Sequence, residues 1–471
     1  MPAAPDLSAS ILQALRRQGG ALSSAELQTA LRVSQPTVSR ALAPLIQAGE
    51  VQKVGAARKQ RYVLPRTVRD VGRSVPIMRI NAQGQPSPFG RMVPLASGAV
   101  WVDEEDGLSK RFDGLPWFLD DMRPQGFMGR TFAHTHPELQ LGNDPRFWSD
   151  DDVLRALALC GDDLPGNLVV GEAAFARFHT LPQRASRAAS PADYPALADA
   201  AMQGTMGGSS AGGEQPKFCT IVAGSAAGDT SGDAARHVLV KFSPAGNAPT
   251  DQRTRDLLVC EHLALQTLAS AGIAAAASCI HTGAGRVFLE VERFDRTPIN
   301  AANPQGLGRI GMVSLMVYDA EYVGAMDNWA ATANRMQERG LLRPADARTL
   351  RLLEAFGELI ANTDRHYGNI SLLLDDDDWA LAPAYDMLPM LYAPVGGELV
   401  PRNFADRPLQ PTAATLPEWP QALALARSFW AAAAADVRIS AGFRQIAVEN
   451  LSHISRSVSY THLTLPTSEL V

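Results

Sequence analysis

The first 64 residues change from a helical to a strand-like pattern of apolar positions. Apolar residues recur every three or four positions in three stretches, which end at Gly19-Gly20, near Leu31 and at Gly49. Ser34-Gln35-Pro36 opens the third stretch with a proline where a missing N–H costs little. Two short apolar strands, 51–54 and 61–64, follow around a glycine turn. Three helices and a hairpin, in this order, predict a winged helix-turn-helix over residues 1–66.

Polar and basic side chains gather on the parts of this module that would meet DNA. The start of the third helix enters the major groove in such modules, and a wing touches phosphate. The predicted contacts are Gln35, Thr37, Ser39 and Arg40 on the helix and Arg58, Lys59 and Arg61 on the hairpin. Residues 1–66 hold nine Lys or Arg against three Asp or Glu, although the whole chain has a net charge of −6. A three-helix interaction module with a solvated charged face is the alternative.

The remaining chain has the composition of a globular protein and is long enough for more than one core. No uninterrupted apolar stretch reaches ~18 residues, so we expect no membrane span and a cytoplasmic location. The four cysteines are scattered, and the pair His134 and His136 stands without evident acidic or cysteine partners. We therefore expect both histidines to be structural or surface residues. The segment 459–468 continues neither a helix nor a strand pattern, so residues 457–471 are interpreted as a non-native tail.

A loop rich in glycine and serine, residues 207–217, precedes an apolar strand pattern. Small residues let backbone N–H groups approach phosphate oxygens closely. The candidate phosphate contacts are Ser209, Ser210, Gly212, Gly213 and Lys217. A flexible linker explains the same composition equally well.

Further along, one lysine lies on an apolar strand and one glutamate on the helix after it. Lys241 follows the apolar run 238–240, and Glu261 lies among leucines at helical spacing. Kinases aim such a lysine at nucleotide phosphates and orient it with a helix carboxylate. The two residues therefore predict a phosphate-binding ion pair.

The strongest chemical signal follows an apolar helix over about 345–361. Asp364 and Asn369 have the spacing of a kinase catalytic loop, in which the Asp receives the substrate hydroxyl proton and the Asn binds a metal ion. Asp386 offers a second carboxylate, suited to Mg²⁺ that bridges phosphates. Because Lys241, Glu261 and these three residues occur in kinase order, the sequence predicts phosphoryl transfer.

These motifs together resemble the HipA kinase family over about residues 70–455. The resemblance rests on the Gly-rich loop with Gln-Pro-Lys217, on Val-Lys241-Phe, on Glu292-Arg-Phe-Asp-Arg296, on Asn-Thr-Asp364-Arg-His and on Ala-Tyr-Asp386. The phrases Gly114-Leu-Pro-Trp-Phe and Gly161-Asp-Asp-Leu-Pro-Gly166 also resemble the family's N-terminal lobe. The fused winged helix departs from HipA and is similar to the YjjJ-type branch.

The resemblance implies a role for each matching residue. It implies that Lys241 binds phosphate, that Asp364 is the catalytic base, and that Asn369 and Asp386 bind Mg²⁺. Glu292 and Phe294 would form the hinge that meets the adenine of ATP, and Ser210 would be autophosphorylated. HipA proteins are toxins that typically pair with a separate DNA-binding antitoxin, and the fused module puts the need for one in doubt.

The sequence therefore predicts an α+β protein, with a winged helix-turn-helix followed by a two-lobed, protein-kinase-like fold whose C-lobe is largely helical. We expect an N-lobe over 67–295 and a C-lobe over 296–456. The predicted function is ATP- and Mg²⁺-dependent phosphorylation of protein serine or threonine, with binding to the chain's own promoter and homodimer formation. Aminoacyl-tRNA synthetases or other translation components are the substrates that the resemblance suggests. The alternatives are a transcription regulator whose kinase-like body only senses nucleotide, and a small-molecule kinase.

Overall fold

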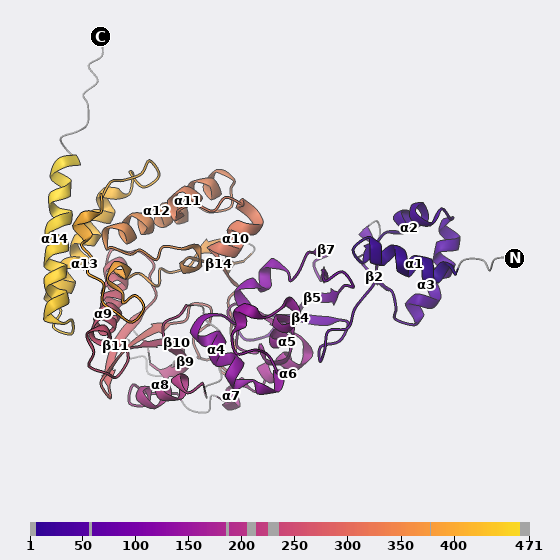
Figure 1. The fold of residues 1–471 in the computed structure, drawn as a ribbon, viewed down its shortest axis with the longest axis horizontal. Helices are drawn as coiled ribbons and strands as arrows, with labels where there is room; N and C mark the ends of the chain where they lie inside the picture. Colours follow the sequence, from indigo (N-terminus) through magenta and orange to yellow (C-terminus); the bar gives the residue numbers. More distant parts are fainter. Residues whose placement is uncertain are drawn as a thin grey trace, which may run out of the picture.

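The protein is described here from a computed structural model (Figure 1). The structure describes residues 6–55, 59–184, 188–204, 213–224, 235–376 and 378–461. Four residues of the predicted sites, Arg58, Ser209, Ser210 and Gly212, lie outside these ranges.

The N-terminal module is a winged helix-turn-helix, as the sequence predicts. Its helices are α1 (Leu7–Arg17), α2 (Ser24–Leu31) and α3 (Gln35–Gln47), and its sheet has the order β1-β3-β2 with β1 (Ala21–Leu22), β2 (Gln52–Val54) and β3 (Arg61–Val63). Ser23 and Glu26 form a capping box that satisfies two backbone N–H groups at the start of α2. The apolar stripes of the three helices meet in one small core.

A five-stranded antiparallel sheet follows, in the order β7-β6-β5-β4-β8. Its strands are β4 (Val75–Ile80), β5 (Pro86–Pro94), β6 (Val100–Glu104), β7 (Ser109–Phe112) and β8 (Leu168–Val170). Its helices include η2 (Trp117–Met122), α4 (Gly126–Thr135), η3 (Pro137–Leu139), η4 (Pro145–Phe147), α5 (Asp150–Cys160) and α6 (Glu172–Phe178). Val153, Leu154 and Leu157 of α5 cover one face of this sheet.

The winged module packs directly on this sheet (Figure 1). Val54 and Val63 share an apolar cluster with Val93, Leu95 and Trp101 of β5, β6 and the turn between them. The contact fixes one end of the module against the middle of the molecule.

A second sheet, in the order β11-β12-β10-β9, forms the next layer. Its strands are β9 (Lys217–Ala223), β10 (Ala235–Phe242), β11 (Ser278–Gly283) and β12 (Arg286–Glu292). The long helix α9 (Pro249–Ser270) packs on β11 and β12, and α8 (Tyr194–Met202) packs on β9, after the short helix α7 (Leu181–Arg184). All pairs in the sheet are antiparallel.

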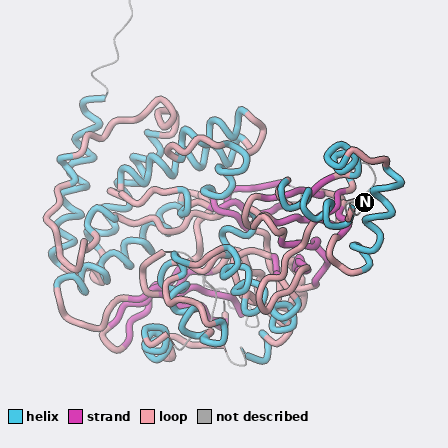
Figure 2. Tube along the Cα trace, turned by 45° about the vertical axis from the view of Figure 1, so that its right-hand side comes forward, coloured by secondary structure: helices cyan, strands magenta, loops and turns pink. Residues whose placement is uncertain are grey.

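The C-terminal lobe is largely helical, as predicted (Figure 2). It contains α10 (Leu315–Tyr318), the π-helical turn η5 (Asp319–Val323), α11 (Trp329–Glu338), α12 (Pro344–Leu359), η6 (Tyr367–Asn369), η7 (Met390–Tyr392), η8 (Phe404–Asp406), α13 (Trp419–Ala435) and α14 (Ala441–Thr461). A small sheet, β13-β14-β15 (Met312–Ser314, Ser371–Asp375, Asp378–Leu381), lies beside them. One continuous core joins α9 to α11, α12 and α13. The α+β class and the two-lobed arrangement are therefore confirmed.

The C-terminal helix runs further than the sequence indicated. α14 continues to Thr461, into the segment 459–468 for which no helix was expected. Residues 462–471 lie outside the described ranges. Among the described helices, none combines the length and apolar character needed to cross a membrane.

Candidate active site

The predicted lysine, helix carboxylate and second carboxylate meet between the second sheet and the C-terminal lobe. Lys241 lies on β10, and its Nζ donates to both carboxylate oxygens of Glu261 on α9, at 2.8 and 3.0 Å. The same ammonium also donates to Asp386. Burial alone would lower the pKa of Lys241, but the charges of Asp386 and Glu261 outweigh it and hold that pKa above its ordinary value. The ammonium therefore stays charged in a nearly water-free position.

A second lysine lies directly across the sheet. Lys217 on β9 faces Lys241 on β10 in the antiparallel register, so both side chains lie on one face. Burial, and next the positive charge of Lys241, lower the pKa of Lys217 to about 8. A Cβ added at Gly213 would come within 2.9 Å of the Lys217 Nζ, so the end of the Gly-rich segment adjoins this ammonium.

The loop of Asp364 and Asn369, the predicted catalytic loop, is held in place by hydrogen bonds from its own polar residues. The Asn369 side-chain amide donates to the backbone oxygen of Asp364 at 2.9 Å, and the Asp364 N–H donates to Asn362 Oδ1 at 3.0 Å. Arg365 donates to Glu354 Oε1 on α12 at 2.9 Å, which ties the loop to the helix before it. These bonds leave the Asp364 carboxylate half exposed at the surface of the site.

The surroundings of Asp364 and Asp386 shift the pKa values of these two carboxyl groups in opposite directions. Burial raises the pKa of Asp364, and the negative charge of Asp386 adds to the effect. For Asp386, burial opposes ionisation, but Lys241 and then Lys217 outweigh it and lower the pKa. Asp386 therefore stays a carboxylate, whereas Asp364 has the greater tendency to accept a proton.

Two residues of the site hold left-handed backbone conformations that favour glycine. Asp386 has φ of 57° and Ala361, where α12 ends, has φ of 59°. The turn at Ala361 is closed by bonds from its own N–H to Glu358 and from the Asn362 N–H to Gly357. Strain at a non-glycine residue is concentrated at functional positions, and Asp386 fits that pattern.

The segment after β12 is where the sequence placed the adenine hinge. Glu292 ends the strand, and its N–H donates to the Ala277 oxygen at 2.9 Å. The next N–H, of Arg293, donates to the His237 oxygen, also at 2.9 Å. The Phe294 ring lies 5.5 Å from the ring of Tyr385, the residue before Asp386. The segment therefore borders the site, although the N–H groups of Glu292 and Arg293 already have partners.

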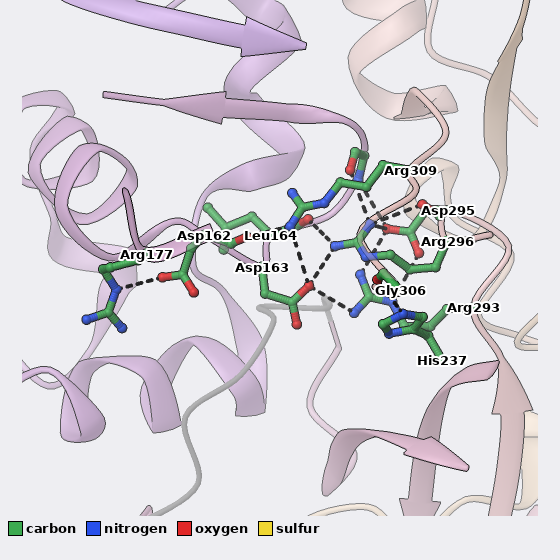
Figure 3. Close-up of polar contacts among 11 residues, drawn as sticks. Asp162, Asp163, Leu164, Arg177, His237, Arg293, Asp295, Arg296, Gly306 and Arg309 are labelled. Atoms are coloured by element: carbon green, nitrogen blue, oxygen red, sulfur yellow. Dashed lines mark hydrogen bonds and ion pairs between the residues drawn. The ribbon is translucent and has the colours of Figure 1, made fainter. Parts of the chain in front are cut away.

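Sequence reasoning missed a largely buried charge network beside the predicted hinge segment (Figure 3). Arg296 joins Asp163 at 2.8 Å and Asp295 at 2.7 Å, and Arg293 joins Asp295 at 2.9 Å. Burial opposes the charges of both acids, but the neighbouring arginines outweigh it and hold their pKa values below the ordinary range. The network's residues belong to two phrases noted only for their resemblance, and the signal was that both phrases are rich in charge.

The predicted DNA-binding face is only partly open. Gln35, Ser39 and Arg40 are exposed on α3, and Lys59 is exposed on the wing. Thr37 is half-buried, with its hydroxyl 2.9 Å from that of Ser34.

Inside the wing, Arg61 pairs with Glu26 of α2, so part of its charge is neutralised within the module. The root of the wing also touches the middle sheet, because the Gly55 N–H donates to Asp103 Oδ1 at 3.1 Å.

Comparison with known proteins finds three family models along the chain. The MarR family matches residues 5–61, the middle domain of YjjJ-like toxins matches 71–179, and the HipA-like C-terminal domain matches 209–455. The curated protein Toxin YjjJ of Escherichia coli (strain K12) is 37% identical over 438 residues, which covers 91% of this chain and 94% of that protein.

Two solved structures are also similar at low identity. A chain of the Shewanella oneidensis MR-1 toxin–antitoxin complex of HipA, HipB and operator DNA is 14% identical, with a TM-score of 0.41 over 83% of this chain and 92% of that one. The Helicobacter pylori proinflammatory kinase CtkA is 14% identical, with a TM-score of 0.31 over 52% of this chain and 93% of that one.

Proposed function

This chain belongs to the HipA-like family, in its YjjJ-like toxin branch, and from that membership we propose that it is an ATP- and Mg²⁺-dependent serine/threonine protein kinase that also binds DNA. The observation that carries the proposal is the meeting of Lys241, Glu261 and Asp386 beside the loop of Asp364 and Asn369. These residues come from four separate stretches of the chain, since Asp364 and Asn369 share one loop. A kinase-like domain that only sensed nucleotide would not require Asp364 as a base.

The residues near Asp386 have the chemistry that Mg²⁺ prefers. Hard oxygen donors hold this ion, and the Asp386 carboxylate is ionised and partly exposed. The Asn369 amide nitrogen is engaged with the Asp364 backbone, so its Oδ1 is the atom suited to a metal ion. When bound, Mg²⁺ would neutralise charge on the phosphates.

Within this proposal each side chain has one task. Lys241, oriented by Glu261, attracts the phosphate oxygens, and Lys217 adds a second ammonium on the same face. Asp364 accepts the proton of the substrate hydroxyl, to which its raised pKa suits it. The Gly-rich loop with Ser209, Ser210 and Gly212 lies outside the described residues, and its role as phosphate cradle and autophosphorylation site rests on the family resemblance.

DNA binding is proposed for the winged module, whose sequence matches the MarR family. The exposed start of α3 and Lys59 support it, and the chain's own promoter is the first fragment to test. Homodimer formation and a substrate among translation components, such as an aminoacyl-tRNA synthetase, extend the same proposal.

The deciding experiment is incubation with γ-labelled ATP and Mg²⁺, followed by mapping of phosphorylated residues. We expect label on serine or threonine, including Ser210 or Ser209, and none with Asp364→Asn, because an amide cannot take up the proton. Asp375→Asn, which changes an exposed acid outside the site, is the matched control and keeps activity. Equal labelling by the Asp364→Asn protein would exclude the assigned base, and absence of label in the wild type with retained ATP binding would favour a nucleotide sensor.

A further inference from the structure

A group of metal-binding side chains lies in the middle domain, away from the kinase-like site. His136, Glu138 and Cys160 each offer one donor atom, and all three atoms lie within 4.8 Å of one another. The sequence had set His136 aside for want of acidic or cysteine partners. The structure does show such partners, because Glu138, two residues further along the chain, and Cys160 of α5 both lie beside His136.

The spacing of the donors is close to that of a coordination shell. His136 Nδ1 lies 3.0 Å from Glu138 Oε1, and Cys160 Sγ lies 3.6 Å from the same oxygen. In a tetrahedral zinc site with bonds of about 2.0–2.3 Å, neighbouring donors are separated by roughly 3.3–3.7 Å. Small side-chain rotations would therefore bring all three atoms around one ion.

Two helix ends create an electrostatic setting that favours a cation. His136 is the residue directly after α4, and Cys160 is the last residue of α5. Helix C-termini carry partial negative charge on their free carbonyl groups. The nearby cation Arg177 is paired with Asp162 at 2.8 Å, which offsets its repulsion of a metal ion.

The donors are held by a packed core but remain reachable. Phe132, Leu139, Ala156 and Cys160 form one apolar cluster that joins α4, η3 and α5. His136 and Cys160 also line a cavity of about 450 Å³. The Glu138 side chain is 57% exposed, so an ion has a path from solvent.

We propose that His136, Glu138 and Cys160 form a zinc site whose fourth position opens toward this cavity. Imidazole, carboxylate and thiolate together suit Zn²⁺ better than Mg²⁺ or Ca²⁺, which prefer oxygen donors alone. Three protein donors and one open position leave room for water or a small anion. The site is independent of the proposed phosphoryl transfer.

Binding requires a balanced change of protons. The Cys160 thiol loses its proton to solvent when sulfur binds the ion. The His136 proton that Nδ1 donates to Glu138 in the metal-free protein is exchanged for one on Nε2, so that Nδ1 can bind the metal. The Glu138 oxygen exchanges its hydrogen bonds for the metal bond. Zinc uptake therefore releases about one proton per site and is favoured by rising pH.

The test is zinc analysis of the full chain after equilibrium dialysis against Zn²⁺, with Co²⁺ as a spectroscopic substitute. We expect one tightly held zinc per chain, and a sulfur-to-cobalt charge-transfer band in the near ultraviolet. Glu138→Gln should weaken zinc binding at least about tenfold. Because this side chain is exposed, its replacement leaves folding intact.

Cys160→Ser should abolish the charge-transfer band. Cys219→Ser, which changes another thiol lining the same cavity, and His134→Ala, which changes the exposed histidine two residues away, are the controls and should keep both zinc and band. A wild type that retains no zinc would overturn the proposal and leave a hydrogen-bonded structural triad. A Cys160→Ser protein that folds, as judged by circular dichroism, and still binds one zinc equally tightly would also overturn it.

Discussion

Charge is nearly balanced among the buried side chains of the kinase-like site. The ammonium groups of Lys217 and Lys241 face the carboxylates of Glu261 and Asp386, and Asp364 adds one negative charge at the rim. A polyphosphate entering alone would leave a large excess of negative charge in a poorly solvated volume. Entry together with a divalent cation keeps the balance, which is a physical reason to expect ATP to bind as its Mg²⁺ complex.

The ion pair of Lys241 and Glu261 gives the first prediction. Glu261→Gln keeps the size of the side chain but removes the charge that orients Lys241, so phosphoryl transfer at saturating ATP should fall on the order of 100-fold. Glu338→Gln, on the exposed end of α11, is the matched control. An unchanged kcat, with an unchanged melting temperature, would show that Lys241 needs no partner.

The second prediction concerns pH. Lys217 is charged below its pKa of about 8 and neutral above it, so affinity for Mg²⁺–ATP should fall as pH rises through about 8. Calorimetric titrations at constant free Mg²⁺ measure this dependence. Lys217→Met should bind more weakly at pH 7 and lose the inflection near pH 8. An inflection of the same size in that variant would assign the titration to another group.

The residues of the candidate site, and the pair of Lys241 with Glu261, could be predicted from the sequence, whereas the charge network beside them could not. Lys241, Asp364 and Asp386 lie in motifs with fixed spacing, and such spacing can be recognised in the sequence alone. Asp163 and Arg296 are 133 positions apart, and no local pattern reports a contact of that kind. His136 and Cys160 escaped notice for the same reason.

At the scale of elements, the charge network joins a loop of the middle domain to the segment after β12. The Gly166 N–H donates to Asp295, and the Arg296 guanidinium donates to the Leu164 oxygen at 2.8 Å. The two parts of the chain are thus held by buried ion pairs with additional hydrogen bonds. Removing one member therefore leaves the remaining charges with fewer partners.

Arg296→Ala therefore gives the third prediction. Leaving the buried Asp295 and the partly buried Asp163 without this partner should lower the free energy of unfolding by about 3–5 kcal/mol. Arg438→Ala, which breaks a pair between the exposed Arg438 and the partly buried Asp436 at the surface, should cost at most about 1 kcal/mol. Urea unfolding at neutral pH compares the two variants. Equal effects would show that the network contributes no more than a surface pair.

Helix α3 and the wing give the fourth prediction, which rests on the proposed DNA contact. Arg40→Ala should cost about 1–3 kcal/mol on the preferred promoter fragment and little on unrelated DNA, because base contacts carry specificity. Lys59→Ala should weaken both equally and reduce the slope of affinity against salt by about one. Gel shifts at several salt concentrations separate the two patterns. A uniform loss for both variants would place Arg40 on phosphate.

The winged module also shows which elements the hydrophobic pattern of the sequence can predict. Its three helices and the pairing of β2 with β3 followed from periodicity and turn residues. The third strand, β1, has only two residues, which is too short for any alternation to be visible. Sheet order in the two larger sheets depends on pairing between distant strands and was likewise unreadable.

At the scale of the whole molecule, the winged module packs against the middle domain through several polar and apolar contacts. Arg66 pairs with Asp151 of α5, and the Ser97 hydroxyl donates to the Gly19 oxygen at 2.9 Å. Together with the shared apolar cluster, these contacts hold the winged module directly against the middle domain. DNA bound at α3 would therefore meet the kinase-like lobes in one fixed orientation.

Deletion of residues 1–66 gives the last prediction. The truncated protein should lose retardation of the promoter fragment but keep phosphoryl transfer, because Lys241, Asp364 and Asp386 lie in other layers. It should also melt at a lower temperature and aggregate more readily, since Val93, Leu95 and Trp101 lose their cover from Val54 and Val63. The full chain carrying Arg40→Ala is the matched control, because it loses DNA preference without exposing that surface. Light scattering and thermal melts of the two proteins decide the matter. An unaltered melting temperature after deletion would mean that the contact adds nothing to stability, and retained promoter binding would place the DNA contact elsewhere.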